Sequence, residues 1–293
     1  MHKISTIRRR RFKREKEETS KNDTENISGL NTYTATRRYT NIPKVLVSSK
    51  LFKNEKYMEE MEDIISINQN FNGDKNQHLF CVFDGHCGDE TAKFSYENFR
   101  IIFSELLKKN PNNIEKCLND SFIKLDEKTK KEEFDYIGNT ATIVFIDKNI
   151  LYCANVGDSR CVLVGFDKPY RMSYDDKVSD DSEMKRILSV GGKIRKKRIL
   201  GELAISRGIG DHEYKKHGLI AIPHINKKII GYNEKYCIIA SDGLWDFVCD
   251  ETVYNISMNI DKGKDLCEKL VNVAINIGSQ DNISVIVLSF REN

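Results

Sequence analysis

The chain has 293 residues, of which 39% are hydrophobic, and this length allows one large domain or two small ones with a sizeable core. Its net charge of +3 is unevenly placed, because residues 1–16 carry eight Lys or Arg and one Glu. Subtracting these from the 47 bases and 44 acids of the whole chain leaves 39 bases and 43 acids. A folded body that binds nucleic acid is therefore not expected.

The cysteines favour a reducing compartment. Eight are scattered along the chain without a Cys-x-x-Cys pair, and several lie inside apolar runs, which favours reduced, buried thiols over a zinc site. No apolar run is long enough for a membrane span, no signal-peptide core follows the basic start, and His2 excludes N-myristoylation. We expect a monomer in the cytoplasm, the nucleus or both.

Residues 1–43 are polar and charged without a sustained apolar period, so they are predicted to form a basic, disordered N-terminal extension. The basic run at residues 8–14 is typical of a nuclear-localisation or acidic-surface-binding patch, and a solvated charge run explains it equally well. Pro43 marks the predicted boundary, and one folded domain is expected over residues 44–293.

From Lys44 onward the hydrophobic pattern is that of a folded α+β domain. Apolar runs rich in β-formers predict strands, and apolar positions at near-helical spacing predict helices. The predicted strands cover residues 64–67, 79–83, 142–146, 150–156, 161–164, 236–240 and 283–290. The predicted helices cover residues 89–109, 113–131, 181–189 and 265–277, the last ending at Gly278, and residues 167–200 resemble a surface flap.

Several predicted strands end beside an acid. The apolar run at residues 79–83 stops at Asp84, Gly85 and His86. A carboxylate held by a packed strand can ligate a metal, Gly85 lets its own carbonyl approach the same ion, and His86 can move a proton. Acids lie beside other apolar runs in the same way, at Asp63, Asp158, Asp242 and Asp281.

Five carboxylates at strand edges are best explained by a shared cation. Clustered carboxylates repel one another unless a cation neutralises them, and ligand sets made of oxygen select hard ions such as Mg²⁺ or Mn²⁺. Unrelated capping and turn aspartates would explain any one of these positions, but they explain the whole set poorly. The sequence therefore predicts a divalent-metal site.

Seven short motifs occur in order along the chain, among them Met-Glu-Asp, Asp-Gly-His-x-Gly, Gly-x-Thr-Ala and Ser-Asp-Gly-x-Trp-Asp. They lie within residues 61–63, 82–88, 138–141, 154–160, 203–211, 241–246 and 278–284. The ordered set resembles the metal-dependent type 2C serine/threonine protein phosphatase (PPM) family over residues 44–293. The resemblance implies a four-layer sandwich of two antiparallel β-sheets flanked by α-helices, and phosphoprotein substrates whose phosphoserine and phosphothreonine are hydrolysed.

The resemblance also implies a role for each matched residue. Two ions, Mg²⁺ or Mn²⁺, would be bound by Asp84, the Gly85 carbonyl, Asp242 and Asp281, while Glu62 and Asp63 would hold metal-bound waters. Asp158 and Asp246, with Asp242, would form a weaker third-metal site. His86 would be the general acid, and Asp63 would support catalysis. A metal-activated water would then attack phosphorus in line, without a covalent intermediate.

Two departures from the family pattern concern substrate binding. Met58 occupies the position of the arginine that usually grips the substrate phosphate, so the phosphate-binding residue is not identified by the motifs. Lys53, Lys56 and Arg198 are candidate replacements. Asp176 also stands where a histidine is usual in the flap.

Two alternatives to phosphatase activity stay open. The first is a catalytically weak or inactive type 2C-like scaffold that binds partners or phosphoproteins. The second, less favoured, is a metal-dependent nuclease or phosphodiesterase that uses the basic tail. Because all the matched metal ligands are present, catalysis as a protein phosphatase is the leading hypothesis.

Overall fold

The computed structural model describes residues 43–132 and 134–290. The predicted N-terminal extension, apart from Pro43, therefore lies outside the described residues. Within the described ranges, no helix is both long enough and apolar enough to cross a membrane.

The first sheet is antiparallel and contains the central strand predicted from the sequence. Its strand order is β11-β5-β4-β3-β2, and the short strand β10 pairs with β4. The strands are β2 (Asp63–Asn68), β3 (Gln77–His86), β4 (Gly138–Asp147), β5 (Ile150–Val156), β10 (Ile209–Gly210) and β11 (His224–Ile229).

The second sheet is also antiparallel, with the order β1-β13-β12-β6-β7. Its strands are β1 (Leu46–Phe52), β6 (Arg160–Gly165), β7 (Pro169–Arg171), β12 (Glu234–Ala240) and β13 (Ile283–Ser289). β5 and β6 follow each other in the chain but belong to different sheets, so the turn between them links the two sheets.

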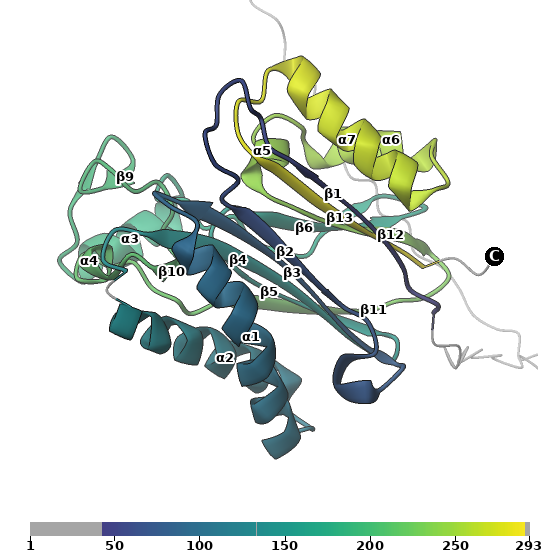
Figure 1. Ribbon diagram of the computed structural model, residues 1–293, viewed down its shortest axis with the longest axis horizontal. Helices are drawn as coiled ribbons and strands as arrows, with labels where there is room; N and C mark the ends of the chain where they lie inside the picture. The colour runs from purple at the N-terminus through teal and green to yellow at the C-terminus, as the bar shows by residue number, and fades with distance from the viewer. Residues whose placement is uncertain (1–42, 133, 291–293) are drawn as a thin grey trace, which may run out of the picture. The chain divides into compact units, whose positions relative to one another are not determined.

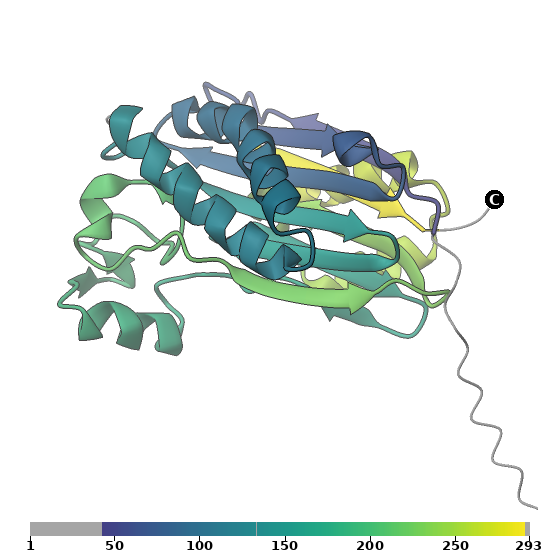
Figure 2. The same cartoon turned by 90° about the horizontal axis from the view of Figure 1, so that it is seen from below.

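Helices cover the outer face of each sheet. α1 (Glu90–Lys109) and α2 (Ile114–Thr129) lie on the first sheet, and α6 (Asp250–Met258) and α7 (Gly263–Ile277) lie on the second (Figure 1). Figure 2 shows α1 and α2 side by side across the strands of the first sheet. The predicted four-layer sandwich is confirmed.

Local signals explain where the helices begin and end. The Asn113 side chain accepts a hydrogen bond from the Lys116 amide at the start of α2, which satisfies one free amide of the first turn. Gly278 ends α7 with φ 113°, a left-handed conformation that glycine adopts at little cost. The predicted helices therefore differ from those observed by only one or two residues at their ends.

The remaining elements lie mainly in the flap and at the edges of the sandwich. They are two short 3₁₀ turns, η1 (Phe71–Gly73) and η2 (Lys130–Glu132), and the elements α3 (Asp181–Ser189), β8 (Ile194–Arg195), β9 (Arg198–Ile199), α4 (His212–Lys215) and α5 (Asp242–Trp245). Among them, α3, α4 and β9 lie together at one end of the sandwich (Figure 1).

The strand β3 shows why its apolar run is unbroken. Leu79, Cys81 and Phe83 pack in the cluster beneath α1 and α2. Phe80 and Val82 pack in the cluster between the two sheets. A strand buried on both faces has no solvent-facing positions for polar residues, so its sequence does not alternate. Both hydrophobic clusters hold the end of β3, where Asp84 and His86 lie, in a fixed place.

Candidate active site

The register of the first sheet brings two predicted acids together. Asp63 on β2 is directly opposite Asp84 on β3, and Asp84 is opposite Thr140 on β4. The second sheet joins this end through Ser241, whose hydroxyl donates to Asp63 Oδ2 at 2.7 Å. This buried bond ties the residue after β12 to the first residue of β2, and it places the following residue, Asp242, at the same edge.

A cavity of about 320 Å³ opens at this edge of the sandwich. It is lined by most of the residues that the sequence assigned to metal binding and catalysis, namely Glu62, Asp84, Gly85, His86, Asp158, Asp242 and Asp281. These residues come from the strand β3 and from segments that precede or follow strands of both sheets. The tertiary structure thus gathers acids that are almost 220 residues apart in the chain.

Two of the predicted residues do not line the cavity. Asp63 is buried behind it, with its carboxylate accepting from Ser241. Asp246 lies beyond the lining residues and pairs with Lys177. The acids predicted to bind metal therefore form one cluster in the cavity, and Asp63 and Asp246 lie beside that cluster.

The carboxylates of the cluster raise one another's pKa. Burial, followed by the charges of neighbouring aspartates, raises the pKa of Asp84 and of Asp242 well above the usual range. Burial likewise raises the pKa of Asp63 to about 6, despite the hydrogen bonds that it accepts. Such a cluster stores electrostatic repulsion whenever its acids are ionised.

This donor set fits a hard divalent cation. All the candidate side-chain ligands are carboxylates, and oxygen ligands of this kind suit Mg²⁺ and Mn²⁺. In the described part of the chain, no three Asp, Glu, His or Cys side chains already form a closed ligand group. The acids thus line the wall of the cavity without meeting at one point, and cation binding would relieve their repulsion.

Gly85 is required by its surroundings. A Cβ at this position would lie 2.8 Å from the Glu62 carbonyl oxygen and 3.1 Å from the Gly88 carbonyl oxygen. The first of these separations is shorter than van der Waals contact allows, and the crowding atoms belong to the backbone. The Gly85 amide also donates to the Glu62 carbonyl at 3.3 Å. Only glycine fits between β3 and the residue that precedes β2.

His86 is held by Asp211, which ends the motif at residues 203–211 but was given no role by the sequence analysis. Its Nε2 lies 2.7 Å from Oδ2 of Asp211, which is fully buried. Burial alone would lower the pKa of His86, but the hydrogen bond and the charge of Asp211 outweigh it and raise this pKa. Gly138 leaves room for the pair, because a Cβ there would collide with both side chains. The protonated imidazole is thus favoured beside the cavity.

A lysine lies between the acids of the predicted third-metal site. Lys177 Nζ is 2.6 Å from Asp246 Oδ1 and 3.4 Å from Asp158 Oδ2. Burial opposes its positive charge, but the two aspartates outweigh burial and raise the pKa of Lys177 to about 12. An ammonium group therefore already neutralises these acids.

Met58 does line the cavity, where it can offer neither charge nor a hydrogen-bond donor. Of the three candidate replacements, Arg198 on β9 lines the same cavity, and Lys53 and Lys56 do not. Among the described lining residues, Arg198 is the one Lys or Arg. It is therefore the candidate for contacting a bound anion.

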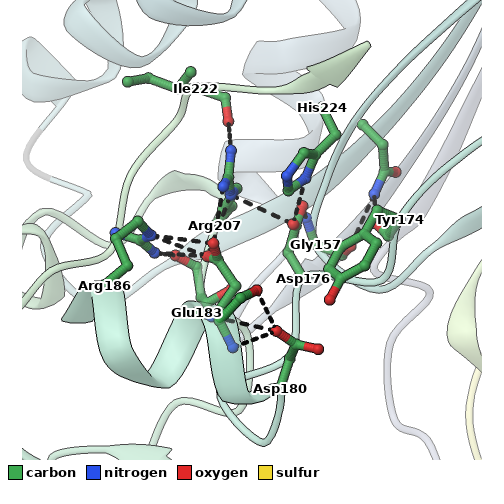
Figure 3. A network of polar contacts seen from close by, with 12 residues as sticks. Gly157, Tyr174, Asp176, Asp180, Glu183, Arg186, Arg207, Ile222 and His224 are labelled. Atoms are coloured by element: carbon green, nitrogen blue, oxygen red, sulfur yellow. Dashed lines mark hydrogen bonds and ion pairs between the residues drawn. The ribbon is translucent and has the colours of Figure 1, made fainter. Parts of the chain in front are cut away.

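Asp176, at the departure from the usual flap histidine, is buried in a polar network (Figure 3). Its carboxylate accepts from the Gly157 amide at 3.1 Å and lies 2.8 Å from Nδ1 of His224 on β11. Burial raises the pKa of Asp176 to about 6, although the His224 and Arg207 charges oppose that rise. The network ties the flap to the turn that carries Asp158, and His224 supplies an imidazole from another strand.

Comparisons with known proteins show what this chain is similar to. The family model described as Protein phosphatase 2C matches residues 47–283. The chain is 31% identical over 254 residues to "Protein phosphatase 2C homolog 1" of Saccharomyces cerevisiae, covering 80% of this chain and 90% of that protein. It is 32% identical over 250 residues to the protein of the same name in Schizosaccharomyces pombe, covering 82% and 72%.

Solved structures share the fold at lower sequence identity. A serine-threonine phosphatase 2C from Toxoplasma gondii superposes with a TM-score of 0.71 at 18% identity, covering 85% of this chain and 100% of that one. A C. elegans sex determining protein superposes with a TM-score of 0.75 at 23% identity, covering 84% and 65%. These likenesses show the same architecture.

Proposed function

Because this chain belongs to the protein phosphatase 2C family, we propose that the acid-lined cavity is its active site, where phosphoserine and phosphothreonine of proteins are hydrolysed with divalent metal. The chain is a metal-dependent serine/threonine phosphatase by family. The observation that carries the site assignment is that Asp84, Asp242 and Asp281, from distant parts of the chain, line one cavity with His86. An inactive scaffold is not favoured, because the cavity acids of the family motifs are all present.

The metal ligands in this proposal are Asp84, the Gly85 carbonyl, Asp242 and Asp281, with Glu62 and Asp63 acting through water. Two ions, Mg²⁺ or Mn²⁺, would supply positive charge for the phosphoryl oxygens and acidify the attacking water. The protein's own part is to hold these oxygen donors at one edge of two packed sheets. Their mutual repulsion, visible in the raised pKa of Asp84 and Asp242, favours cation binding.

His86 is the proposed general acid. Attack on phosphorus expels a serine or threonine alkoxide, which is a poor leaving group unless it receives a proton. The imidazolium of His86 lies at the cavity, and Asp211 keeps it protonated and fixes its orientation at 2.7 Å. After proton transfer, the neutral imidazole regains a proton from water.

A direct assay tests the proposed function. Phosphate release from a phosphoserine peptide is expected with Mg²⁺ or Mn²⁺ and not after chelation with EDTA, while a nucleic acid of equal phosphate content stays intact. Peptide turnover that persists in EDTA would refute the metal-centre proposal. Cleavage of the nucleic acid without peptide turnover would favour the nuclease alternative.

The arginine missing at position 58 gives a kinetic prediction. Met58→Arg is expected to lower KM for small phosphoesters by roughly tenfold, about 1.4 kcal/mol of binding, because guanidinium pairs with phosphate through charge-assisted hydrogen bonds. The measurement is steady-state kinetics at saturating Mn²⁺. Met58→Leu is the matched control, since it keeps the apolar volume and adds no charge, and its KM should equal that of the parent.

The same kinetic experiment can test whether Arg198 contacts the substrate phosphate. If Arg198 now contacts the phosphate, Arg198→Ala raises KM in the parent and raises it less when Met58→Arg is present. The two effects would then couple in a double-mutant cycle. An unchanged KM in Met58→Arg would show that another group already fills this corner of the cavity.

Lys177 gives a prediction about the third-metal site. We propose that its ammonium competes with a cation for Asp158 and Asp246, which it contacts directly. Lys177→Met should therefore tighten the weakest Mn²⁺ binding step by at least about fivefold, since a unit charge at this range contributes about 1 kcal/mol or more. Calorimetric titration with Mn²⁺ measures this step independently of turnover.

Lys227→Met is the control for that titration, because it also breaks a lysine pair, with Glu115 at 2.9 Å, on an exposed surface. Its Mn²⁺ affinities should match those of the parent. Equal affinities in Lys177→Met and the parent would remove Lys177 from any role at a third cation site.

A further inference from the structure

A strongly basic turn stands out on the flap. Residues 193–198, here called the basic hairpin, contain Lys193, Arg195, Lys196, Lys197 and Arg198, and all five side chains belong to exposed residues. In the part of the chain that the structure describes, none of these five has an ion-pair partner. Other cations in or near the flap are paired, for example Arg186 and Arg207 with Glu183 (Figure 3). The charge of the basic hairpin is thus available to a ligand.

The basic hairpin is an ordered element. Its two strands pair β8 with β9, and the Leu200 amide donates to the Lys193 carbonyl at 2.8 Å. Ile199 at its base is fully buried in a small hydrophobic cluster with Val178, Ile187 and Leu219. The five charges are therefore presented from an anchored support, which lowers the entropy cost of binding a partner.

The tip of the basic hairpin keeps its lysines in an unfavourable conformation. Lys196 has φ 51° and Lys197 has φ 59°, the left-handed region at both central residues of the turn. Such two-residue turns favour Asn-Gly, because side chains with a Cβ are disfavoured there. Backbone strain that persists in a structure is a reason to look for a function of the strained residues. Here the strained residues both carry positive charge.

The basic hairpin adjoins the proposed active site. Arg198, its last residue, lines the acid-lined cavity. Lys196 is two residues away across the turn, so the Cα atoms of Lys196 and Arg198 are at most about 7 Å apart. That span equals about two residues of an extended substrate peptide. A peptide whose phosphate enters the cavity would therefore bring its flanking residues past the basic hairpin.

We propose that the basic hairpin binds acidic residues that flank the phosphorylated serine or threonine of a protein substrate. This inference rests on the proposed phosphatase function and names the substrate class, phosphorylation sites within acidic sequence. Nucleic acid is the less suitable partner, because the chain after residue 16 carries more acids than bases and five cations make a small footprint.

The test compares phosphoserine peptides that differ in flanking charge. One pair has three Glu or three Gln on the N-terminal side of phosphoserine, and a second pair has them on the C-terminal side. The full-length parent should hydrolyse the Glu peptide of at least one pair with about tenfold higher kcat/KM, since three exposed charge pairs at two- to threefold each multiply to that value. The preference should decrease as salt is added.

The variant Lys193→Gln, Lys196→Gln, Lys197→Gln removes three charges and keeps Arg198 in the cavity. It should lose the preference for Glu peptides, while its turnover of the Gln peptides and of p-nitrophenyl phosphate equals that of the parent. The matched control, Lys262→Gln, Lys264→Gln, Lys269→Gln, removes three exposed charges on or beside α7 and should keep the preference. All three proteins retain the basic residues 1–16, so the tail does not contribute to the difference.

Equal rates on Glu and Gln peptides in the parent would overturn the proposal, as would a preference that survives in the hairpin variant or is lost equally in the α7 control. Inhibition by a 20-nucleotide RNA that requires the basic hairpin, without any peptide preference, would assign the surface to nucleic acid instead.

If no peptide is hydrolysed by the parent, the proposed function fails separately. Fluorescence anisotropy of a labelled, unphosphorylated Glu peptide then tests the basic hairpin by itself. Binding that requires the basic hairpin would support its role in binding acidic sequence, and no such binding would refute that role.

Discussion

Asp242→Asn is expected to reduce turnover of a phosphoserine peptide by roughly 10²- to 10³-fold while making the metal-free protein more resistant to heat. The loss of activity is expected because Asp242 is a proposed metal ligand. The cations that it would help to hold would neutralise the charge on the phosphoryl group. The gain in stability follows because burial, and after it the charges of Asp63 and Asp242, raise the pKa of Asp84, so removing the charge of Asp242 removes one source of repulsion in the folded protein. Steady-state kinetics and thermal unfolding in EDTA measure the two effects.

The stability effect has a definite sign with pH. A carboxyl group whose pKa is raised on folding binds its proton more tightly in the folded chain than in the unfolded chain. Metal-free stability therefore falls as pH rises from the ordinary carboxyl range through the raised values, about 6 for Asp63. Mn²⁺ should restore stability above that pH, and Asp242→Asn should reduce the fall.

Asp147→Asn is the matched control, because Asp147 ends β4 at the opposite edge of the first sheet and is paired in register with Gln77. It should leave peptide turnover and the pH dependence of stability close to those of the parent. Full activity in Asp242→Asn, or equal metal-free stability of parent and variant at pH 8, would contradict the cation assignment of this cavity.

His86→Gln is expected to reduce turnover of a phosphoserine peptide by about 10²- to 10⁴-fold, with a much smaller effect on p-nitrophenyl phosphate. The serine alkoxide needs a proton to leave, whereas nitrophenolate leaves readily without one. Comparing kcat for the two substrates in parent and variant therefore isolates proton donation from folding and metal binding. An equal loss on both substrates would instead indicate a damaged cavity.

Asp211 should act through His86. Asp211→Asn keeps the side-chain size but removes the charge that holds the imidazolium, so it should reduce peptide turnover less than His86→Gln and in the same substrate-dependent way. His224→Gln is the control, since His224 also pairs with a buried aspartate, Asp176, at 2.8 Å but does not line the cavity. Its peptide and nitrophenyl activities should change together or remain as in the parent.

Much of the fold could be predicted because short stretches of sequence, such as apolar runs and helix caps, indicate its longer strands and helices. The apolar runs of β3, β4, β5 and β12 are continuous since both faces of each strand are buried between helices and a second sheet. Helix ends follow from single residues, such as Asn113 as N-cap and Gly278 as C-cap. Shorter or more exposed elements escaped prediction, among them β7, β8, β9, β10, β11 and α6. Their stability comes from neighbours that a local window does not contain.

The sequence by itself indicated the family and predicted the carboxylates and His86 as site residues, because they lie at or beside strand ends in motifs of fixed spacing. The sequence did not show which side chains from distant parts of the chain contact one another. Asp211 reaches His86 over 125 residues, and Lys177 reaches Asp246 over 69. These contacts depend on how the flap and the segment that follows it pack against the two sheets, so they are decided by long-range packing and charge complementarity. The same packing decides that Arg198, and neither Lys53 nor Lys56, lines the cavity beside Met58.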